Sequence, residues 1–220
     1  MPRLIDLRRP VVLASALSAA CGGLGGVPPD QLPIVKGADG REYRLMERGA
    51  YKAFYDRWGR LQRIEYDSDG DGRADRIAHH DGTRLPHLIE VDEDFDGSTD
   101  RWEDYDAEGT LVRVGVSRRG GSPDLWNVLG PGGQARRRDY DDDGDGRVDR
   151  SELLGEGQRL RLEVDADRDG RPDRWQDWRK GRLVSEELDT DGDGRADRRL
   201  LYGPDGVVQS LRPLESDAAR

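Results

Sequence analysis

The sequence predicts an all-β fold, an antiparallel β-meander in repeats of about 24 residues with two strands in each repeat. Three observations predict it: an acidic motif recurs at a nearly constant interval, apolar residues alternate before it, and glycine-containing turns divide the segments between its copies. Only about 15 residues separate one motif from the next, so two helices of ordinary length do not fit between motifs. A helical repeat is therefore excluded.

The recurring motif reads Asp-x-Asp-x-Asp-Gly-x-x-Asp and occurs five times. Its copies begin at Asp67, Asp92, Asp141, Asp165 and Asp189, so successive starts differ by 25, 49, 24 and 24 positions. Because the long interval is close to two periods, a further unit is expected at 117–124. That segment lacks the three leading aspartates. We therefore predict six units, of which the third keeps its strands but has no metal loop.

Strands are expected on both sides of each motif. Apolar residues alternate before it, as in Leu160, Leu162 and Val164, which is the period of a half-buried strand. Short stretches such as 173–178 follow it and end at turn signals. The turn glycines are Gly82, Gly109, Gly157, Gly181 and Gly206. Each unit thus consists of strand, acidic loop, strand and hairpin turn, with the loops along one edge of the sheet and the turns along the other.

Composition divides the chain into five segments. Residues 1–20 are predicted to be a signal peptide, 21–34 a flexible linker that begins with a cysteine, 35–62 metal-free capping hairpins, 63–214 the six-unit repeat, and 215–220 a disordered tail.

The signal peptide is predicted from a basic start and a short apolar run. Arg3, Arg8 and Arg9 precede apolar residues 11–20, which are too few to span a bilayer as a stable helix. Small residues then precede Cys21, the only cysteine. This arrangement resembles the lipobox of bacterial lipoproteins, which implies that Cys21 is lipidated and anchors the chain to a membrane. We expect an outer-membrane or cell-surface protein; a plain cleaved signal would leave it periplasmic or secreted.

Charge and composition point to a cation as the stabilising partner. The chain has 46 acidic and 36 basic residues and a formal net charge of -10, which argues against nucleic acid as a partner. Leu, Ile, Val and Phe make up 44 of the 220 residues, too few for a large ordinary core. A single cysteine forms no internal disulfide. Bound metal is the remaining common means of stabilising an exported domain of this kind.

The motif supplies the oxygen ligands that Ca²⁺ prefers. Alternate residues of a curling loop direct carboxylates to one centre, a glycine at position six permits the sharp turn, and position seven offers its backbone carbonyl. Four carboxylates so close together repel one another strongly unless a cation lies among them. We therefore expect up to five calcium ions.

These loops resemble the calcium loops of EF-hands, in a tandem arrangement similar to thrombospondin type 3 and dockerin-like modules. The resemblance implies a further bidentate ligand at position twelve, which is glutamate in two loops, Glu103 and Glu152. The candidate metal-binding residues are Asp67, Asp69, Asp71, Arg73, Asp75, Asp92, Asp94, Asp96, Ser98, Asp100, Glu103, Asp141, Asp143, Asp145, Arg147, Asp149, Glu152, Asp165, Asp167, Asp169, Arg171, Asp173, Asp189, Asp191, Asp193, Arg195 and Asp197. The other three loops are expected to bind more weakly.

An acidic residue also stands two places before each loop. These residues are Glu65, Glu90, Asp139, Glu163 and Glu187. Each either completes a metal shell or forms a cross-strand ion pair with the arginine after the last aspartate of its loop, and we favour the ion pair. The arginines are Arg76, Arg101, Arg150, Arg174 and Arg198.

The predicted function is calcium binding by an exported, non-enzymatic structural or adhesive surface lipoprotein with a protein or polysaccharide ligand. The recurring aromatic residues either line a binding face or, as we favour, pack the buried side of the sheet. They are Trp102, Trp126, Trp175, Trp178, Tyr105 and Tyr202. The alternatives are a calcium sensor or buffer and a secreted hydrolase with paired carboxylates. We expect no enzyme, because the Asp clusters are explained by metal spacing and His79, His80 and His87 lack a nucleophile motif.

Overall fold

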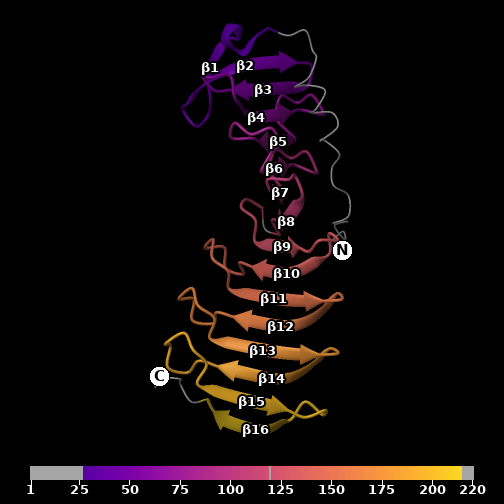
Figure 1. The fold of residues 1–220 in the computed structure, drawn as a ribbon, viewed down its shortest axis with the longest axis vertical. Coiled ribbons are helices and arrows are strands. Elements are labelled where there is room, and N and C mark those ends of the chain that lie inside the picture. The colour runs from indigo at the N-terminus through magenta and orange to yellow at the C-terminus, as the bar shows by residue number, and fades with distance from the viewer. Residues whose placement is uncertain (1–26, 119, 215–220) are drawn as a thin grey trace. The chain divides into compact units, whose positions relative to one another are not determined.

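The computed structural model describes residues 27–118 and 120–214, which form an antiparallel β-meander and confirm the predicted fold class (Figure 1). The strands follow one another in the order of the sequence. Among the described residues, the short 3₁₀ turn Pro29–Gln31 is the only helical segment, and none is long and apolar enough to cross a membrane. The predicted signal peptide, Cys21 and the tail at 215–220 lie outside the described residues.

The chain divides into two compact units, 1–123 and 124–220, which we describe in turn. The described part of the first unit has eight strands. They are β1 (Ile34–Lys36), β2 (Glu42–Arg48), β3 (Tyr51–Tyr55), β4 (Leu61–Tyr66), β5 (Arg76–His79), β6 (Leu88–Val91), β7 (Arg101–Tyr105) and β8 (Leu111–Val116). The segment predicted as capping hairpins, 35–62, spans β2 and β3 together with most of β1 and the start of β4.

The second unit also has eight strands in its described part. They are β9 (Leu125–Leu129), β10 (Ala135–Tyr140), β11 (Arg150–Gly155), β12 (Gln158–Val164), β13 (Arg174–Arg179), β14 (Arg182–Leu188), β15 (Arg198–Tyr202) and β16 (Val208–Pro213). The predicted turn glycines of both units have positive φ: Gly157 and Gly181 lie in two-residue hairpin loops, Gly109 and Gly206 in five-residue loops, and Gly82 in the eight-residue loop between β5 and β6. Their φ values are 81° at Gly82, 80° at Gly109, 77° at Gly157, 74° at Gly181 and 77° at Gly206.

Most hairpin turns are followed by a β-bulge. Asp104 on β7 lies opposite Arg113, and Tyr105 lies opposite Leu111, so Val112 is an extra residue on β8. The same one-residue shift occurs in the pairs β3–β4, β9–β10, β11–β12, β13–β14 and β15–β16. A bulge increases the right-handed twist of its strand pair. The extra residue always lies on the second strand of the hairpin, so side chains on the first strand keep regular alternation.

One face of the first unit, which we call the inner face, is closely packed. Ile64, Ala78, Ile89, Glu103 and Val114 lie directly opposite one another on β4 to β8. Each of these residues is at most 6% exposed. Four of them are apolar, as a buried sheet face requires, and one is a carboxylate that must find its partners within the protein.

The equivalent row of the second unit is more polar, and we give its face the same name. The row consists of Asn127, Arg138, Glu152, Leu162, Gln176, Glu186, Leu200 and Leu211 on β9 to β16. Hydrogen bonds replace part of the apolar packing here, since Gln176 Nε2 and the Tyr202 hydroxyl both donate to Glu186, at 2.9 and 2.7 Å. The sequence has few apolar residues, and polar contacts take their place across part of this inner face.

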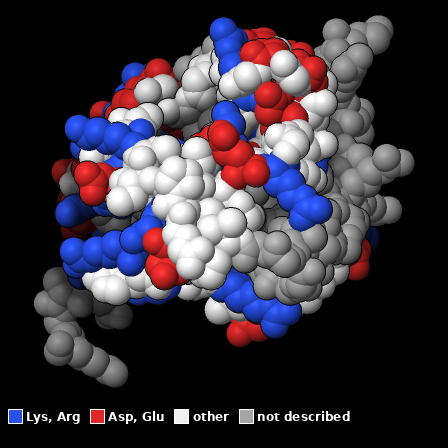
Figure 2. All heavy atoms as spheres, turned by 90° about the horizontal axis from the view of Figure 1, so that it is seen from above, with Lys and Arg blue, Asp and Glu red and all other residues white. Residues whose placement is uncertain are grey.

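The predicted ion pair between the acidic residue before each loop and the arginine after it is wrong. Glu65 lies opposite Ile77, whereas Arg76 lies opposite Tyr66, so strand alternation puts the two charges on different faces. Glu65 pairs instead with Arg63 on its own strand, at 2.8 Å. Asp139 and Glu163 likewise pair with Arg137 and Arg161 on their own strands, whereas Glu187 pairs with Arg199 and Glu90 lies 3.4 Å from His79 on the neighbouring strand. Figure 2 shows basic and acidic side chains interspersed on the surface seen from above.

The aromatic residues that were expected to form one set lie on two faces. Trp102 is opposite Glu90 on the outer face, whereas Tyr105, three residues later, donates its hydroxyl proton to Glu103 on the inner face. Trp126 and Trp175 lie in the outer-face row that contains Asp139 and Glu163. Trp178 and Tyr202 take the place of Tyr105 on their own strands. An odd spacing between positions in a strand separates the rings, so the six rings do not share one face.

The pH dependence of stability is expected to depend on His80, which follows β5 and is 2% exposed. Burial lowers the pKa of its imidazole below the ordinary value of 6.5. Since the unfolded chain takes up the proton first, the unfolding free energy should be constant above about pH 6.5 and fall as the pH drops toward the folded-state pKa. The slope is at most about 1.4 kcal/mol per pH unit for one proton.

Urea unfolding between pH 5 and 8, at fixed calcium concentration, measures this dependence. The variant His80→Gln should show a flatter decline than the parent, because His79 and His87 are common to both proteins. An unchanged slope in His80→Gln would contradict the assignment to this buried imidazole.

Candidate metal-binding loops

The five acidic loops lie where the sequence predicted. In each case the preceding strand ends one residue before the first aspartate, and the next strand begins with the arginine after the last. The loop 67–75, for example, lies between Tyr66, the end of β4, and Arg76, the start of β5. The others join β6 to β7, β10 to β11, β12 to β13 and β14 to β15. In the second unit, Figure 1 shows the loops at one end of the strands and the tight turns at the other.

Three aspartate side chains converge in each loop. They come from positions one, three and five in the loops 67–75 and 92–100, and from positions one, three and nine in 141–149, 165–173 and 189–197. One oxygen from each side chain lies within 4.8 Å of the other two. Oxygens on opposite sides of a calcium ion are about 4.6–5.2 Å apart, because each lies at about 2.3–2.6 Å from it. The donor set and its spacing therefore fit Ca²⁺.

The first aspartate of each loop holds the curve of the backbone. Asp67 accepts hydrogen bonds from the amides of Gly70 and Gly72, at 2.7 and 3.0 Å. The first aspartates of the other four loops accept the same two bonds from positions four and six. The motif spacing therefore gives all five loops the same fold.

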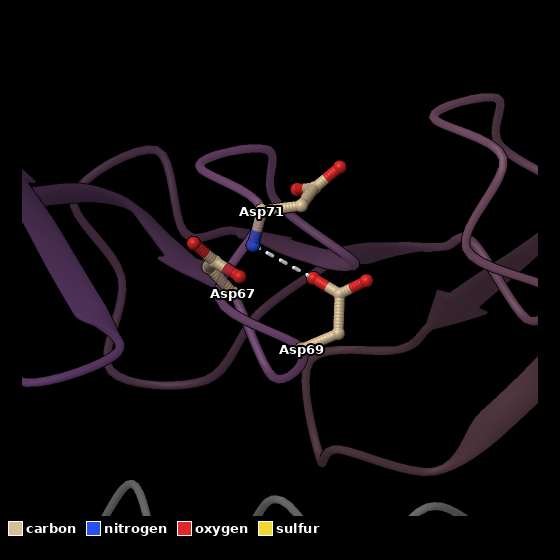
Figure 3. A group of neighbouring side chains, drawn as sticks. All are labelled: Asp67, Asp69 and Asp71. Carbon is tan, nitrogen blue, oxygen red and sulfur yellow. Dashed lines mark hydrogen bonds between the residues drawn. The ribbon is translucent and has the colours of Figure 1, made fainter.

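The other aspartates extend this network. Asp69 accepts from the amide of Asp71 at 3.0 Å, as Figure 3 shows, and Asp71 accepts from the amide of Arg73 at 2.7 Å. Asp75 accepts from the amide of Ser68 at 2.5 Å. The bonds from position seven to position five and from position two to position nine recur in all five loops. The amides of Arg73, Ser98, Arg147, Arg171 and Arg195 are those position-seven donors, and their carbonyls are the atoms proposed as ligands.

Two positions of each loop take a left-handed backbone. Position six is always glycine, with φ between 85° and 95°, as the sequence predicted. Position four was not predicted: it is glycine in three loops, but Phe95 (φ 64°) and Arg168 (φ 66°) in the others. A non-glycine residue costs about 1–2 kcal/mol there, so these two loops retain strain that the hydrogen-bond network must hold.

Hydrogen bonds keep carboxylates of the loop 189–197 ionised. Desolvation acts to raise the pKa of Asp189, but the amides of Gly194 and Gly192 outweigh it and hold this pKa below its ordinary value. Hydrogen bonds from the side chain and amide of Thr190 lower the pKa of Asp197. Both groups are therefore anionic at neutral pH and available to a cation.

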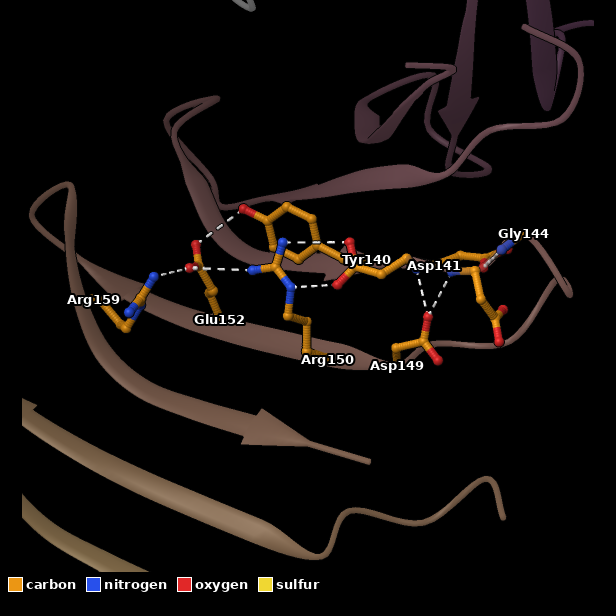
Figure 4. Close-up of polar contacts among 9 residues, drawn as sticks. Tyr140, Asp141, Gly144, Asp149, Arg150, Glu152 and Arg159 are labelled. Atoms are coloured by element: carbon orange, nitrogen blue, oxygen red, sulfur yellow. Dashed lines mark hydrogen bonds and ion pairs between the residues drawn. The ribbon is translucent and has the colours of Figure 1, made fainter. Parts of the chain in front are cut away.

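Glu103 and Glu152, the glutamates at position twelve, are not brought to the aspartate clusters. Each is the third residue of the strand after its loop, with its side chain on the inner face. Glu103 is fully buried and accepts hydrogen bonds from Arg101 and Tyr105. Figure 4 shows Glu152 among Tyr140, Arg150 and Arg159, apart from Asp141 and Asp149. An EF-hand continues into a helix that returns position twelve to the ion, whereas an extended strand carries it away.

Successive loops within a unit contact one another. The amide of Asp92 donates to the carbonyl of Asp75 at 2.8 Å, and Arg73 Nη1 donates to the carbonyl of Asp96 at 3.3 Å. In the second unit, Arg168 Nη1 lies 2.7 Å from Asp143 Oδ2 of the preceding loop. A Cβ atom on Gly97 would lie 2.3 Å from Arg73 Nη1, so the glycine at this position also leaves room for a side chain of the preceding loop.

The fold and site define an antiparallel β-repeat with five acidic, calcium-compatible loops. No family model matches the chain, and no curated protein matches it. Similar solved structures include TarM (10% identity, TM-score 0.29, covering 56% of this chain and 21% of that one) and accessory secretory protein 1, 2 and 3 in Streptococcus pneumoniae (12%, 0.30, 69% and 24%). A mutant of S. aureus TarM in complex with fondaparinux, α-GlcNAc-glycerol and UDP is 9% identical, with a TM-score of 0.29. The chain thus spans less than a quarter of the length of these proteins, and the TM-scores are too low to bear on its function.

Proposed function

We propose that this chain binds up to five calcium ions and acts as an exported, non-enzymatic structural or adhesive surface protein. The observation that carries the proposal is that one backbone hydrogen-bond network recurs in five loops and that three aspartate oxygens lie within 4.8 Å of one another in each, the third from position five in two loops and from position nine in three. An array of acidic turns with no ligand would have no need to conserve this geometry from loop to loop. Hard oxygen donors of this number and charge favour Ca²⁺.

Calcium would supply charge neutralisation and cross-linking of each loop. The three converging aspartates of each loop would hold the ion, with the carbonyl of position seven as a further donor. Five ions would add ten positive charges to a chain of formal net charge -10. The metal would then stabilise a sheet whose apolar face is small, which is a structural role.

The location and anchor belong to the same proposal and are supported by the sequence. The basic start, the apolar run 11–20 and the small residues before Cys21 support export and lipidation. A protein or polysaccharide ligand would meet the outer face, where Trp102 lies in the first unit and Trp126 and Trp175 lie in the second.

Isothermal titration of metal-free protein with CaCl₂ tests the proposal. We expect up to five ions to bind, with dissociation constants of about 10⁻⁴–10⁻³ M for an extracellular structural role. Asp69→Asn keeps an acceptor for the amide of Asp71 and removes one ligand charge, so it should weaken its loop about tenfold or more and spare the others.

Asp104→Asn is the matched control, because Asp104 lies on β7 and pairs with Arg113 outside the loops. It should leave every calcium constant unchanged. Absence of binding at millimolar Ca²⁺ would overturn the proposal. Cooperative binding at micromolar Ca²⁺ would support calcium binding but assign the chain to sensors rather than structural proteins.

A further inference from the structure

Two of the five loops differ from the others at two positions at once. The second residue is acidic only in the loops 92–100 and 141–149, where it is Glu93 and Asp142. Position twelve is glutamate in the same two loops, as Glu103 and Glu152. In the others these two positions are Ser68 with Ala78, Ala166 with Gln176, and Thr190 with Leu200. Two carboxylates that occur together suggest a shared partner between them.

That partner is the arginine at position ten. Arg101 Nη1 lies 3.0 Å from Glu93 Oε1, and its Nη2 donates to Glu103. In the other loop, Arg150 Nε lies 2.6 Å from Asp142 Oδ2, and its Nη1 lies 3.8 Å from Glu152 Oε1 (Figure 4). Each guanidinium therefore links a carboxylate in the loop to one on the inner face of the sheet.

The inner-face end of this link is fixed. Glu103 is fully buried, the Arg101 side chain is 9% exposed, and the Tyr105 hydroxyl donates to the second oxygen of Glu103 at 2.6 Å. Arg150 lies 3.6 Å from the centre of the Tyr140 ring. Arg101 cannot move away without leaving buried Glu103 without its basic partner, which is strongly unfavourable. Glu152 is held by Arg159 and Tyr140 as well, so it is a fixed partner for Arg150. In both loops the second residue is thus tied to a buried carboxylate of the sheet.

We infer that Arg101 and Arg150 are positioning residues that preorganise the loops 92–100 and 141–149 for calcium. The inference rests on the proposed function. Each arginine holds the start of its loop through the second residue, whose amide also donates to the aspartate at position nine. A loop held in its binding shape loses less conformational freedom when the ion binds, so these two loops bind Ca²⁺ most tightly. Glu103 and Glu152 contribute through the arginines and not as calcium ligands.

Calcium titration of variants at position two tests this, because ligation by Glu103 and Glu152 would not involve that position. The double variant Glu93→Gln/Asp142→Asn should raise the dissociation constants of the two tightest sites about tenfold, which is the loss of roughly 1.4 kcal/mol per loop. The exchange variant Glu93→Asp/Asp142→Glu should restore tight binding, because each loop then has at position two the acidic residue that the other loop has there.

A gain of function provides a test that does not depend on a weakened protein. The loop 165–173 already has Arg174 at position ten. The variant Ala166→Asp/Gln176→Glu supplies both missing carboxylates and should create a third tight site.

Two outcomes separate the inference from the proposed function. A parent protein that binds no calcium overturns both. A parent that binds calcium, with unchanged constants in Glu93→Gln/Asp142→Asn and no third tight site in Ala166→Asp/Gln176→Glu, overturns only the positioning role. If, in addition, Glu103→Gln and Glu152→Gln weaken binding, the glutamates would be assigned as ligands.

Discussion

Chelation with EGTA is expected to lower the melting temperature of the purified chain by about 14–28 °C, on the scale of 2–4 °C per kcal/mol for domains of this size. At a free calcium concentration ten times the dissociation constant, each site adds about 1.4 kcal/mol of stability, so five sites add about 7 kcal/mol. That sum is comparable with the whole stability of an ordinary domain, about 5–15 kcal/mol. The β-sheet signal in circular dichroism should fall at 37 °C and return when CaCl₂ is added.

Two controls separate bound calcium from general charge screening. Sodium chloride at 0.5 M screens exposed charges without occupying the loops, and it should restore only a small part of the lost stability. MgCl₂ should restore less than CaCl₂, because Mg²⁺ demands a tighter octahedral shell and releases water reluctantly. A melting temperature that is the same in EGTA and in millimolar calcium would contradict a structural role for the loops.

Arg101→Met is expected to reduce the unfolding free energy by about 3–5 kcal/mol, the largest effect among the single substitutions considered. The substitution keeps the apolar stem but removes the guanidinium, so fully buried Glu103 loses its basic partner and retains the Tyr105 hydroxyl. A buried carboxylate without a counter-charge bears most of its desolvation cost. Urea unfolding in saturating calcium measures the loss while keeping the loops occupied.

A second substitution tests whether the loss comes from the unpaired charge. In Arg101→Met/Glu103→Leu both charges are replaced by apolar groups, and most of the stability should return. Arg113→Met is the matched surface control, because Arg113 is half-exposed and its pair with Asp104 should contribute less than about 1 kcal/mol. Equal losses in Arg101→Met and Arg113→Met would show that Glu103 does not depend on Arg101.

The sequence was sufficient for the repeat because its two signals are local. Strand alternation and the acidic motif act over fewer than ten residues, and each motif closes its own hydrogen-bond network, as Asp67 does with Gly70 and Gly72. The strand limits at Tyr66 and Arg76 follow directly, since the first is the residue before the loop and the second the residue after it. Predictions of this kind do not depend on which residues of the neighbouring strand lie opposite.

Pairings across strands were predicted less well. The expected pair of Glu65 and Arg76 fails because register puts them on opposite faces. The single set of aromatic residues fails because Trp102 and Tyr105 are three positions apart on one strand, which also puts them on opposite faces. A position-twelve glutamate such as Glu103 matches the EF-hand pattern in sequence, but the segment that carries it is a strand here. The sequence did hold a sign of the link through Glu93 and Asp142, since position two is acidic only in the two loops whose position twelve is glutamate.

The sequence by itself determined the all-β class, the period, the five acidic loops and the absence of the acidic motif from the third unit, because each depends on backbone conformation and spacing within one repeat. Only the tertiary structure decided which side chains meet. Cross-strand register and the recurring bulges, as at Val112, assign each residue to a face, and neither can be read from one strand alone. That is why the aspartates were found in the sequence, while the arginines that link two of their loops to the sheet were found in the structure.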